Sequence, residues 1–438
     1  MQLRPAADGY RFSRIMHIIE AALEYFVSIA VGTVYLARLT AYIGFSDALT
    51  GILSSFVSLG CGFQLIAVFL ANKRPVKRWV TALHTLSQSF FAFIYFIPLF
   101  EISKIAKTVL FVAVLLVAHI VHNAIYSPKI NWYMALVPNE RRGRFTADKE
   151  IVSLVSGMAF SYALGAVIDH FEAAGEIRTA FIVCGIGLFV IMALHSLTLV
   201  LSKEKPAEES EKISTAKTLK ALFRNKTLFK IILISVLWNV ANYATLSFTG
   251  TYQAKELAFS AAFSSLVIMI GSLVRAVISR PIGAFGDKFS FAKMLTLCLF
   301  IEAAAYAVNL FTAPENGKAL YTVHYILYCI GMAGANSAPI NLVYDYVERS
   351  QRTGALALQQ TFAGFAGFLA TLCLSPLVTY IQESGNQFLG FDVYAQQVMS
   401  AISLLIVLIL IVYMYTVVRK LKRLPCAEKN EKNDREEE

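Results

Sequence analysis

The chain alternates between long apolar runs and short polar gaps. A helix that crosses a membrane needs roughly 20 mostly apolar residues, and by this criterion about twelve runs qualify. The pattern therefore predicts an all-α polytopic membrane protein with twelve transmembrane helices. The predicted spans are 16–39, 48–71, 79–100, 108–136 (broken at Pro128), 151–168, 179–201, 231–250, 261–278, 291–312, 319–347, 355–381 and 395–418.

One polar stretch is longer than the others and divides the spans into two equal sets. We therefore expect an N-terminal bundle over 1–201, a cytoplasmic linker over 202–230, a C-terminal bundle over 231–420 and a charged cytoplasmic tail over 421–438. Within the linker, residues 213–229 mix Lys and Arg with leucine and phenylalanine. This mixture fits either an amphipathic helix on the membrane surface or a solvated tether.

Composition agrees with a membrane protein. Hydrophobic residues make up 57% of the chain and charged residues 16%, whereas soluble domains lie near about 45–50% and about 25%. The net charge of +10 could indicate a nucleic-acid partner. The Lys and Arg residues gather in alternate gaps instead, which is the pattern that sets membrane orientation. We therefore expect a multi-pass protein of the cell membrane with both termini cytoplasmic, in contact with lipid and not with nucleic acid.

The two halves repeat one another. The polar gap at 137–144 is similar in sequence to 346–354, and each follows the fourth span of its half. The gap at 71–74 likewise stands where 286–288 stands in the second half. Two parallel six-helix repeats are an architecture of membrane transporters.

A glycine-rich, charged segment at 280–293 lies between two apolar runs and is predicted to be a polar turn. Its residues Gly283, Gly286, Asp287, Lys288 and Lys293 resemble the signature that the major facilitator superfamily carries between the second and third helix of each half. The first-half copy contains Asn72 and Lys73, with Asn72 where the family has an acid. With the six-plus-six layout, the resemblance covers almost the whole chain.

The resemblance implies that this segment is a latch of the cytoplasmic gate. Asp287 would accept hydrogen bonds at the positive N-terminal end of a helix near Gly354, or pair with Arg349 or Arg352. Gly283 and Gly286 would let helix ends approach closely. Asn72 would make the first-half latch weaker. The alternative is that Asp287 lies in a solvated loop.

Polar residues inside predicted spans are candidates for a site because lipid penalises them. In the first half these are Glu24 in the first span and His119, His122 and Asn123 in the fourth. In the major facilitator fold these two helices line the cavity, so the resemblance implies that Glu24 could meet a histidine there. Glu24 would then be a coupling carboxylate for protons or another cation. The alternative is a structural pair that braces the first helix, with Glu20 at a helix interface.

The second half offers uncharged polar candidates. These are Trp238, Asn239, Asn242, Tyr328 and Asn336. Such side chains suit a neutral, hydroxylated or partly aromatic solute, or else hold membrane helices together. We expect Arg275 and Glu302 to form a structural pair, and His324 to be solvated near the outer end.

Enzyme, metal and cofactor motifs are not apparent in the sequence. We therefore expect a monomeric secondary active transporter that moves a small organic solute by rocker-switch alternating access. Proton-coupled uptake is favoured over export because exporter motifs are missing from the fourth and fifth spans. An exporter of the same fold and a non-transporting membrane sensor remain the alternatives.

Overall fold

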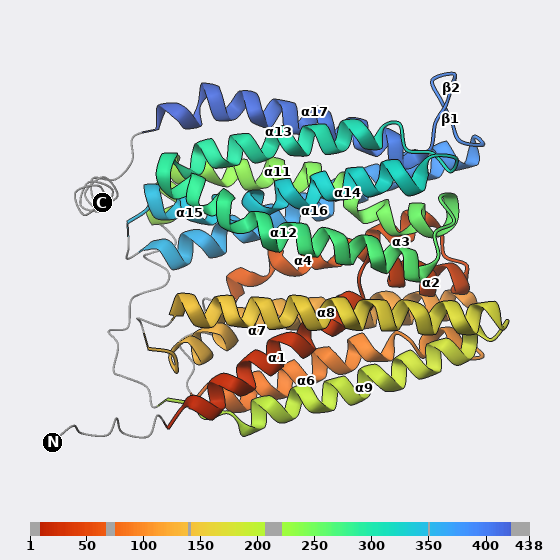
Figure 1. The fold of residues 1–438 in the computed structure, drawn as a ribbon, viewed down its shortest axis with the longest axis horizontal. Coiled ribbons are helices and arrows are strands. Elements are labelled where there is room, and N and C mark those ends of the chain that lie inside the picture. The colour runs from red at the N-terminus through yellow and green to blue at the C-terminus, as the bar shows by residue number, and fades with distance from the viewer. Residues whose placement is uncertain (1–8, 67–74, 139–141, 206–220, 349–350, 422–438) are drawn as a thin grey trace.

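Long helices run side by side along the long axis of the molecule (Figure 1). The computed structural model describes residues 9–66, 75–138, 142–205, 221–348 and 351–421. We call the end where α1 begins and α17 ends the terminal end, and the end that carries the strands β1 and β2 the hairpin end. Helices suit a chain in lipid because each satisfies its backbone hydrogen bonds within itself.

The first half of the chain forms one group of helices. Its elements are α1 (Arg11–Ala30), α2 (Thr33–Ile43), α3 (Asp47–Ser54), α4 (Phe56–Gly62), α6 (Lys77–Phe93), η1 (Ile97–Leu99), α7 (Lys104–Met134), α8 (Arg142–Ala173) and α9 (Ile177–Leu201).

The second half forms the other group. Its elements are α11 (Lys226–Thr251), the π-helix η3 (Tyr252–Glu256), α12 (Ala261–Phe289), α13 (Phe291–Asn309), α14 (Gly317–Ala335), α15 (Ala338–Tyr346), α16 (Arg352–Glu383), β1 (Gln387–Phe388), β2 (Phe391–Asp392), α17 (Ala395–Thr416) and η5 (Val418–Lys420).

Ten helical segments of the described chain are long and apolar enough to cross a membrane. The helices α1 and α2 make an eleventh if this bent pair, with a 43° angle, counts as one span. The place of the third predicted span is taken by α6, which at 17 residues is shorter than a full crossing. The observed helices are therefore consistent with the twelve predicted spans.

The structure differs from the predicted spans at two expected interruptions and at one break that was not predicted. Pro128 does not break its span, because α7 continues through it from Lys104 to Met134; neighbouring helices commonly satisfy the backbone groups that a proline frees in a membrane helix. The predicted turn at 280–293 is helical as far as Phe289, where α12 ends. The span at 319–347 is instead broken between α14 and α15, at Asn336 and Ser337.

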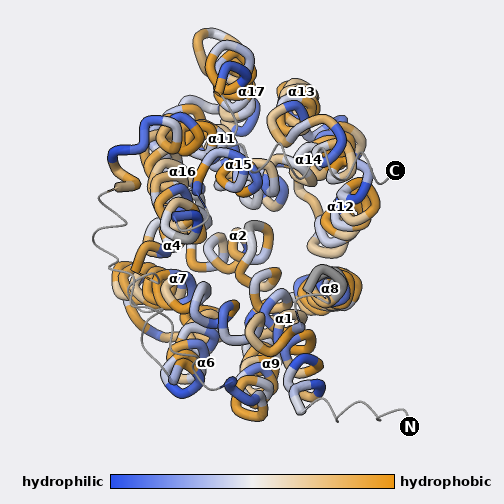
Figure 2. The backbone as a smooth tube through the Cα atoms, turned by 90° about the vertical axis from the view of Figure 1, so that its left-hand side faces the viewer, coloured by the Kyte–Doolittle hydropathy of each residue, from blue (hydrophilic) through white to orange (hydrophobic). Residues whose placement is uncertain are grey.

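The two halves lie on opposite sides of the molecule when it is viewed from the terminal end (Figure 2). They are joined at the hairpin end. The Tyr35 hydroxyl lies 2.6 Å from the Ser265 hydroxyl, and the Asp169 carboxylate accepts hydrogen bonds from the backbone amides of Ala261 and Ala262 at 2.8 and 2.7 Å. Asp169 therefore caps the N-terminus of α12 from the opposite half, where the helix dipole favours a negative charge.

A second set of polar contacts at the hairpin end joins α3 to the second half. Asp47 forms an ion pair with Lys255 and accepts a hydrogen bond from Gln382 at 2.7 Å. The same Gln382 amide donates to Glu256 at 3.2 Å. We call Asp47, Lys255, Gln382 and Glu256 the hairpin-end lock.

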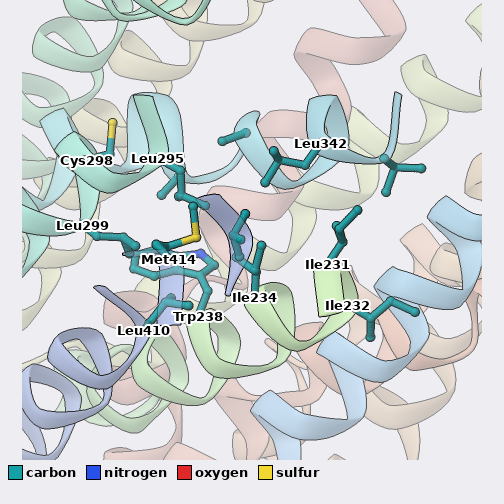
Figure 3. Packing of buried hydrophobic residues seen from close by; sticks show 14 of the residues in the cluster. Ile231, Ile232, Ile234, Trp238, Leu295, Cys298, Leu299, Leu342, Leu410 and Met414 are labelled. Atoms are coloured by element: carbon teal, nitrogen blue, oxygen red, sulfur yellow. The ribbon is translucent and has the colours of Figure 1, made fainter. Parts of the chain in front are cut away.

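The largest apolar core lies within the second half (Figure 3). Trp238 of α11 packs there with Leu410 and Met414 of α17 and is 4% exposed. Burying a large aromatic side chain in such a cluster stabilises the bundle by several kcal/mol, about 3–5 by alanine substitution. Trp238, predicted as a candidate for the site, is therefore part of this core.

Candidate functional site

A cavity of about 510 Å³ is lined mainly by the first half and reaches α12 of the second half at Arg275. Its walls come from α1, α4, α6, α7 and α8 of the first half and from Arg275 on α12 of the second. His17, Lys149 and Glu150 line its part nearest the terminal end. The size is within the range of about 300–1,000 Å³ that small-molecule sites occupy.

A buried charge cluster forms the first-half wall of this cavity. Glu20 and Glu24 lie one turn apart on α1, and both accept hydrogen bonds from the Lys129 ammonium of α7, at 2.8 and 2.6 Å. The side chains of Lys129 and Glu20 are 1% and 0% exposed, whereas Glu24 is 20% exposed. Isolated charges would be costly at this depth, so each carboxylate depends on the lysine.

Four histidines surround the cluster. His17 and His195 contact Glu20 at 3.1 and 3.0 Å, and His84 lies 3.0 Å from His195. His122 Nδ1 lies 3.6 Å from the Glu24 carboxylate.

The same side chains offer ligand atoms to a metal ion. Glu20, His84 and His195 form one group and Glu24, His84 and His122 another, each with its ligand atoms within 4.8 Å of one another. Lys129 already stands between the two carboxylates and supplies the positive charge that a metal would bring. The geometry therefore favours a cluster paired with a tethered ammonium over a metal centre.

The structure brings together part of the predicted first-half site. Glu24 and His122 are adjacent as expected. His119 also lines the cavity and packs edge-on against Phe91, 4.8 Å between ring centres. Asn123 lines the cavity and donates from its amide to the His119 carbonyl at 3.0 Å.

Sequence reasoning missed Lys129, His84 and His195. The signal for Lys129 was present, because a lysine inside an apolar run is expensive in lipid and marks function by default. The break predicted at Pro128 placed this lysine near a helix end instead. His84 and His195 are single histidines in separate spans, and only the packing of α6 against α9 brings them together.

The predicted second-half residues lie away from this cavity. The Tyr328 hydroxyl donates to the Asn242 side chain at 2.9 Å, and both line a much smaller cavity within the second half. Asn239 donates to the backbone carbonyl of Ser235 at 2.9 Å. Asn336 is exposed at the break between α14 and α15. Together with Trp238, they do not form one site.

Two other expectations for the second half are wrong. Glu302 is 0% exposed, and neither of its oxygens has a hydrogen-bond partner in the described chain, so it does not pair with Arg275. His324 is 4% exposed rather than solvated, and its Nδ1 lies 2.8 Å from the Ala305 carbonyl oxygen.

The contacts predicted for the latch are not formed among the residues that the structure describes. Asp287 is exposed near the end of α12 and has no hydrogen bond or ion pair with another described residue. The Arg352 guanidinium instead donates to the carbonyls of Val347 and Tyr344, at 3.1 and 2.9 Å. Lys288 lies over the Phe289 ring, 5.8 Å from its centre. Asn72, Lys73 and Arg349 lie outside the described residues.

The two latch glycines differ in their surroundings. A Cβ atom at Gly286 would lie 2.6 Å from the Met294 sulfur, whereas one at Gly283 would meet nothing within 4 Å. Gly286 therefore allows a close approach of α12 and α13 within the second half, and Gly283 has no such neighbour among the described residues.

Comparison with known proteins identifies a family with this architecture. The family model described as Major Facilitator Superfamily matches residues 18–371. Over 177 residues, the chain is 27% identical to "Uncharacterized MFS-type transporter YceJ" of Bacillus subtilis (strain 168). This match covers 36% of the chain and 44% of the relative, so the chain spans less than half of that relative's length.

Solved structures share the fold at low sequence identity. A mutant of the nucleoside transporter NupG superposes with a TM-score of 0.73 at 15% identity, over 92% of this chain and 99% of that one. A D-xylose-proton symporter gives 0.67 at 13% identity, over 92% and 97%. A bacterial homolog of the human lysosomal transporter Spinster, in an inward-facing, unoccupied conformation, gives 0.70 at 13% identity, over 94% and 98%.

Proposed function

Because the chain belongs to the Major Facilitator Superfamily, we propose that it is a secondary active transporter that carries a small organic solute through the cavity between its halves. The observation that carries this proposal is a cavity of about 510 Å³ with buried charges in its wall. Polar contacts join the halves at the hairpin end, and the cavity reaches toward the terminal end. Rocking of the halves would open the cavity to each side in turn.

Orientation follows from the distribution of charge. Lys and Arg gather in the gaps at the terminal end, which we assign to the cytoplasm by the positive-inside rule. The cavity would then face the cytoplasm in this conformation, and both termini would be cytoplasmic in the cell membrane. We propose that the chain works as a monomer, because the cavity is built within one chain.

We further propose that Glu24 couples transport to protons. It is the more exposed carboxylate of the cluster and faces Lys129 and His122 from α7, Glu20 from its own helix, His84 from α6 and His195 from α9. Closing the cavity around a net charge is costly in lipid. A proton on Glu24 would change the charge of this wall by one unit, which would link the conformational change to proton binding.

Transport by the purified chain in liposomes tests both proposals. Uptake of radiolabelled solutes from a broad panel is measured with and without an inwardly directed proton gradient. We expect the gradient to accelerate uptake by the unmodified chain and to have little effect on Glu24→Gln. A Glu24→Gln variant that keeps the full pH dependence would end the coupling proposal. Transport only outward would indicate an exporter, and neither transport nor binding would favour a sensor.

A further inference from the structure

Opposite charges line the two walls of the cavity. On the first-half wall, Glu20, Glu24 and Lys129 together carry one net negative charge when the imidazoles are neutral, and the charges of Lys149 and Glu150 on the same wall cancel. On the second-half wall, Arg275 of α12 lines the same cavity. Its guanidinium has no hydrogen bond or ion pair with any other residue that the structure describes.

The two charges lie at about the same depth. The contact between Tyr35 and Ser265 fixes α2 against α12 near the hairpin end. Toward the terminal end, Glu24 lies eleven residues from Tyr35, and Arg275 lies ten residues from Ser265. At a rise of about 1.5 Å per residue, Arg275 is about 15 Å from this contact along the continuous helix α12. Glu24 is at most about 16 Å from it, because the 43° bend between α1 and α2 lies on the way. Arg275 therefore stands roughly level with Glu24 on the opposite wall.

The position of Arg275 inside a membrane span requires a physical explanation. An unpaired charge at this depth is expensive, and its usual explanation is a functional partner. A guanidinium is suited to a carboxylate because its planar donors match the two carboxylate oxygens. No carboxylate among the described residues pairs with Arg275, so the partner would come from the solute.

We propose that the cavity binds a zwitterionic organic solute, with its carboxylate at Arg275 and its ammonium group at Glu24. This inference rests on the proposed transport function and names its substrate class. Tyr25, Phe91 and Tyr126 also line the cavity, and aromatic faces attract ammonium groups. The volume suits amino acids and short peptides. A neutral solute, as the second-half polar residues suggested, would leave both wall charges unmatched.

The test uses three forms of one compound. Binding is measured by calorimetry on the purified full chain in lipid nanodiscs. The three forms are alanyl-phenylalanine, its C-terminal amide and its N-acetyl derivative. Single amino acids, phosphoethanolamine, and the neutral probes uridine and D-xylose are measured in the same way. We expect the zwitterions to bind best. Arg275→Gln should weaken binding of the free dipeptide about tenfold to a hundredfold, as loss of a charged hydrogen bond does, and leave binding of the amide unchanged.

The ratio of acid to amide binding separates recognition from folding. If Arg275 only supported the fold, Arg275→Gln would weaken both forms equally, which would overturn the proposal. Arg275→Lys keeps the charge and should restore part of the preference for the acid. Stronger binding of phosphoethanolamine than of every carboxylate probe would overturn the carboxylate assignment.

The remaining outcomes distinguish this inference from the transport proposal. Binding and transport of uridine or D-xylose, without binding of any zwitterion, would overturn the zwitterion while transport stands. If no compound of the broad panel is bound or transported, the proposed function itself fails.

Discussion

Lys129 is the residue on which the first-half wall depends. Its ammonium bonds two carboxylates of α1 in a place where its own side chain is 1% exposed. The net benefit of such a buried ion pair over apolar packing is small, because all its members lose water. Removing one member is strongly destabilising, because the others stay buried without their partner.

We predict that Lys129→Met destabilises the protein strongly. Glu20 is 0% exposed and would remain with only His17 and His195 as partners. Breaking a buried pair by removing one member costs about 3–5 kcal/mol. The measurement is the midpoint of thermal unfolding in detergent, followed by size-exclusion chromatography, and we expect a clear decrease.

A matched control and a double variant make this prediction specific. Lys104→Met changes an exposed lysine of the same helix and should leave the midpoint nearly unchanged. Adding Glu20→Gln to Lys129→Met removes the orphaned charge and should recover part of the loss. Additive effects in the double variant would show that the two side chains do not interact.

At the residue level, the sequence predicted those site residues that stand out within a single span. Glu24 and His122 were identified because each is a polar side chain in an apolar run, and the family resemblance brought their helices together. His84 and His195 carry no comparable signal, since a lone histidine in an apolar span is commonly a packed one. Their contact, like the lack of an Arg275–Glu302 pair, depends on how helices pack in three dimensions.

At the scale of elements, α4 of the first half and α16 of the second half cross closely at glycine residues. A Cβ atom at Gly364 of α16 would lie 2.5 Å from both the backbone nitrogen of Gly62 and the carbonyl oxygen of Ser58 on α4. Ser58 also donates a hydrogen bond to the Gly364 carbonyl at 2.9 Å. Small residues allow such close crossings in membrane bundles.

We therefore predict that Gly364→Ala lowers both thermal stability and transport. The obstructing atoms belong to the backbone, so α4 and α16 would have to move apart. Gly187→Ala on α9 is the control, because a Cβ atom there meets nothing within 4 Å. Alanine in a helix is favoured over glycine by about 0.5–1 kcal/mol, so this control should be neutral or slightly stabilising. Equal losses in both variants would contradict the tight crossing.

Helices were the most predictable elements, and their ends the least. Apolar length identified the spans, because lipid leaves the backbone few other options. The continuation of α12 through Pro281 and two glycines was not foreseen, because these residues end helices in water more readily than in a packed bundle. The end at Ser290 has a local cause: its hydroxyl accepts from the Lys293 amide and starts α13.

The hairpin-end lock carries a prediction for conformational exchange. Lys255→Ala removes the cationic partner of Asp47 while leaving the Gln382 hydrogen bond. We expect the hairpin end to open more often, seen as faster hydrogen–deuterium exchange in residues 252–260. Lys318→Ala, an exposed lysine of the same half, should not change this exchange. Unchanged exchange in Lys255→Ala would mean that the lock does not hold the halves.

At the scale of the whole molecule, this conformation would represent one side of the proposed rocking cycle. Contacts between the halves are engaged at the hairpin end, and Asp287 at the terminal end is exposed without a partner among the described residues. A latch that closes in the opposite conformation would have this arrangement. If Asp287 forms such a latch, its loss would change the rate of exchange between conformations rather than the stability of this one.

We predict that Asp287→Asn impairs transport while leaving thermal stability nearly unchanged. The exposed carboxylate contributes no described contact here, but the closed terminal end would lose a charged hydrogen bond, worth about 1.5–3 kcal/mol. Asn72, which stands at the corresponding place in the first half, already lacks that charge, so Asn72→Ala should have a much smaller effect. Initial rates of uptake in liposomes, normalised to the amount of folded protein, compare the two variants. Equal losses of transport would show that the gate does not depend on the acid at 287.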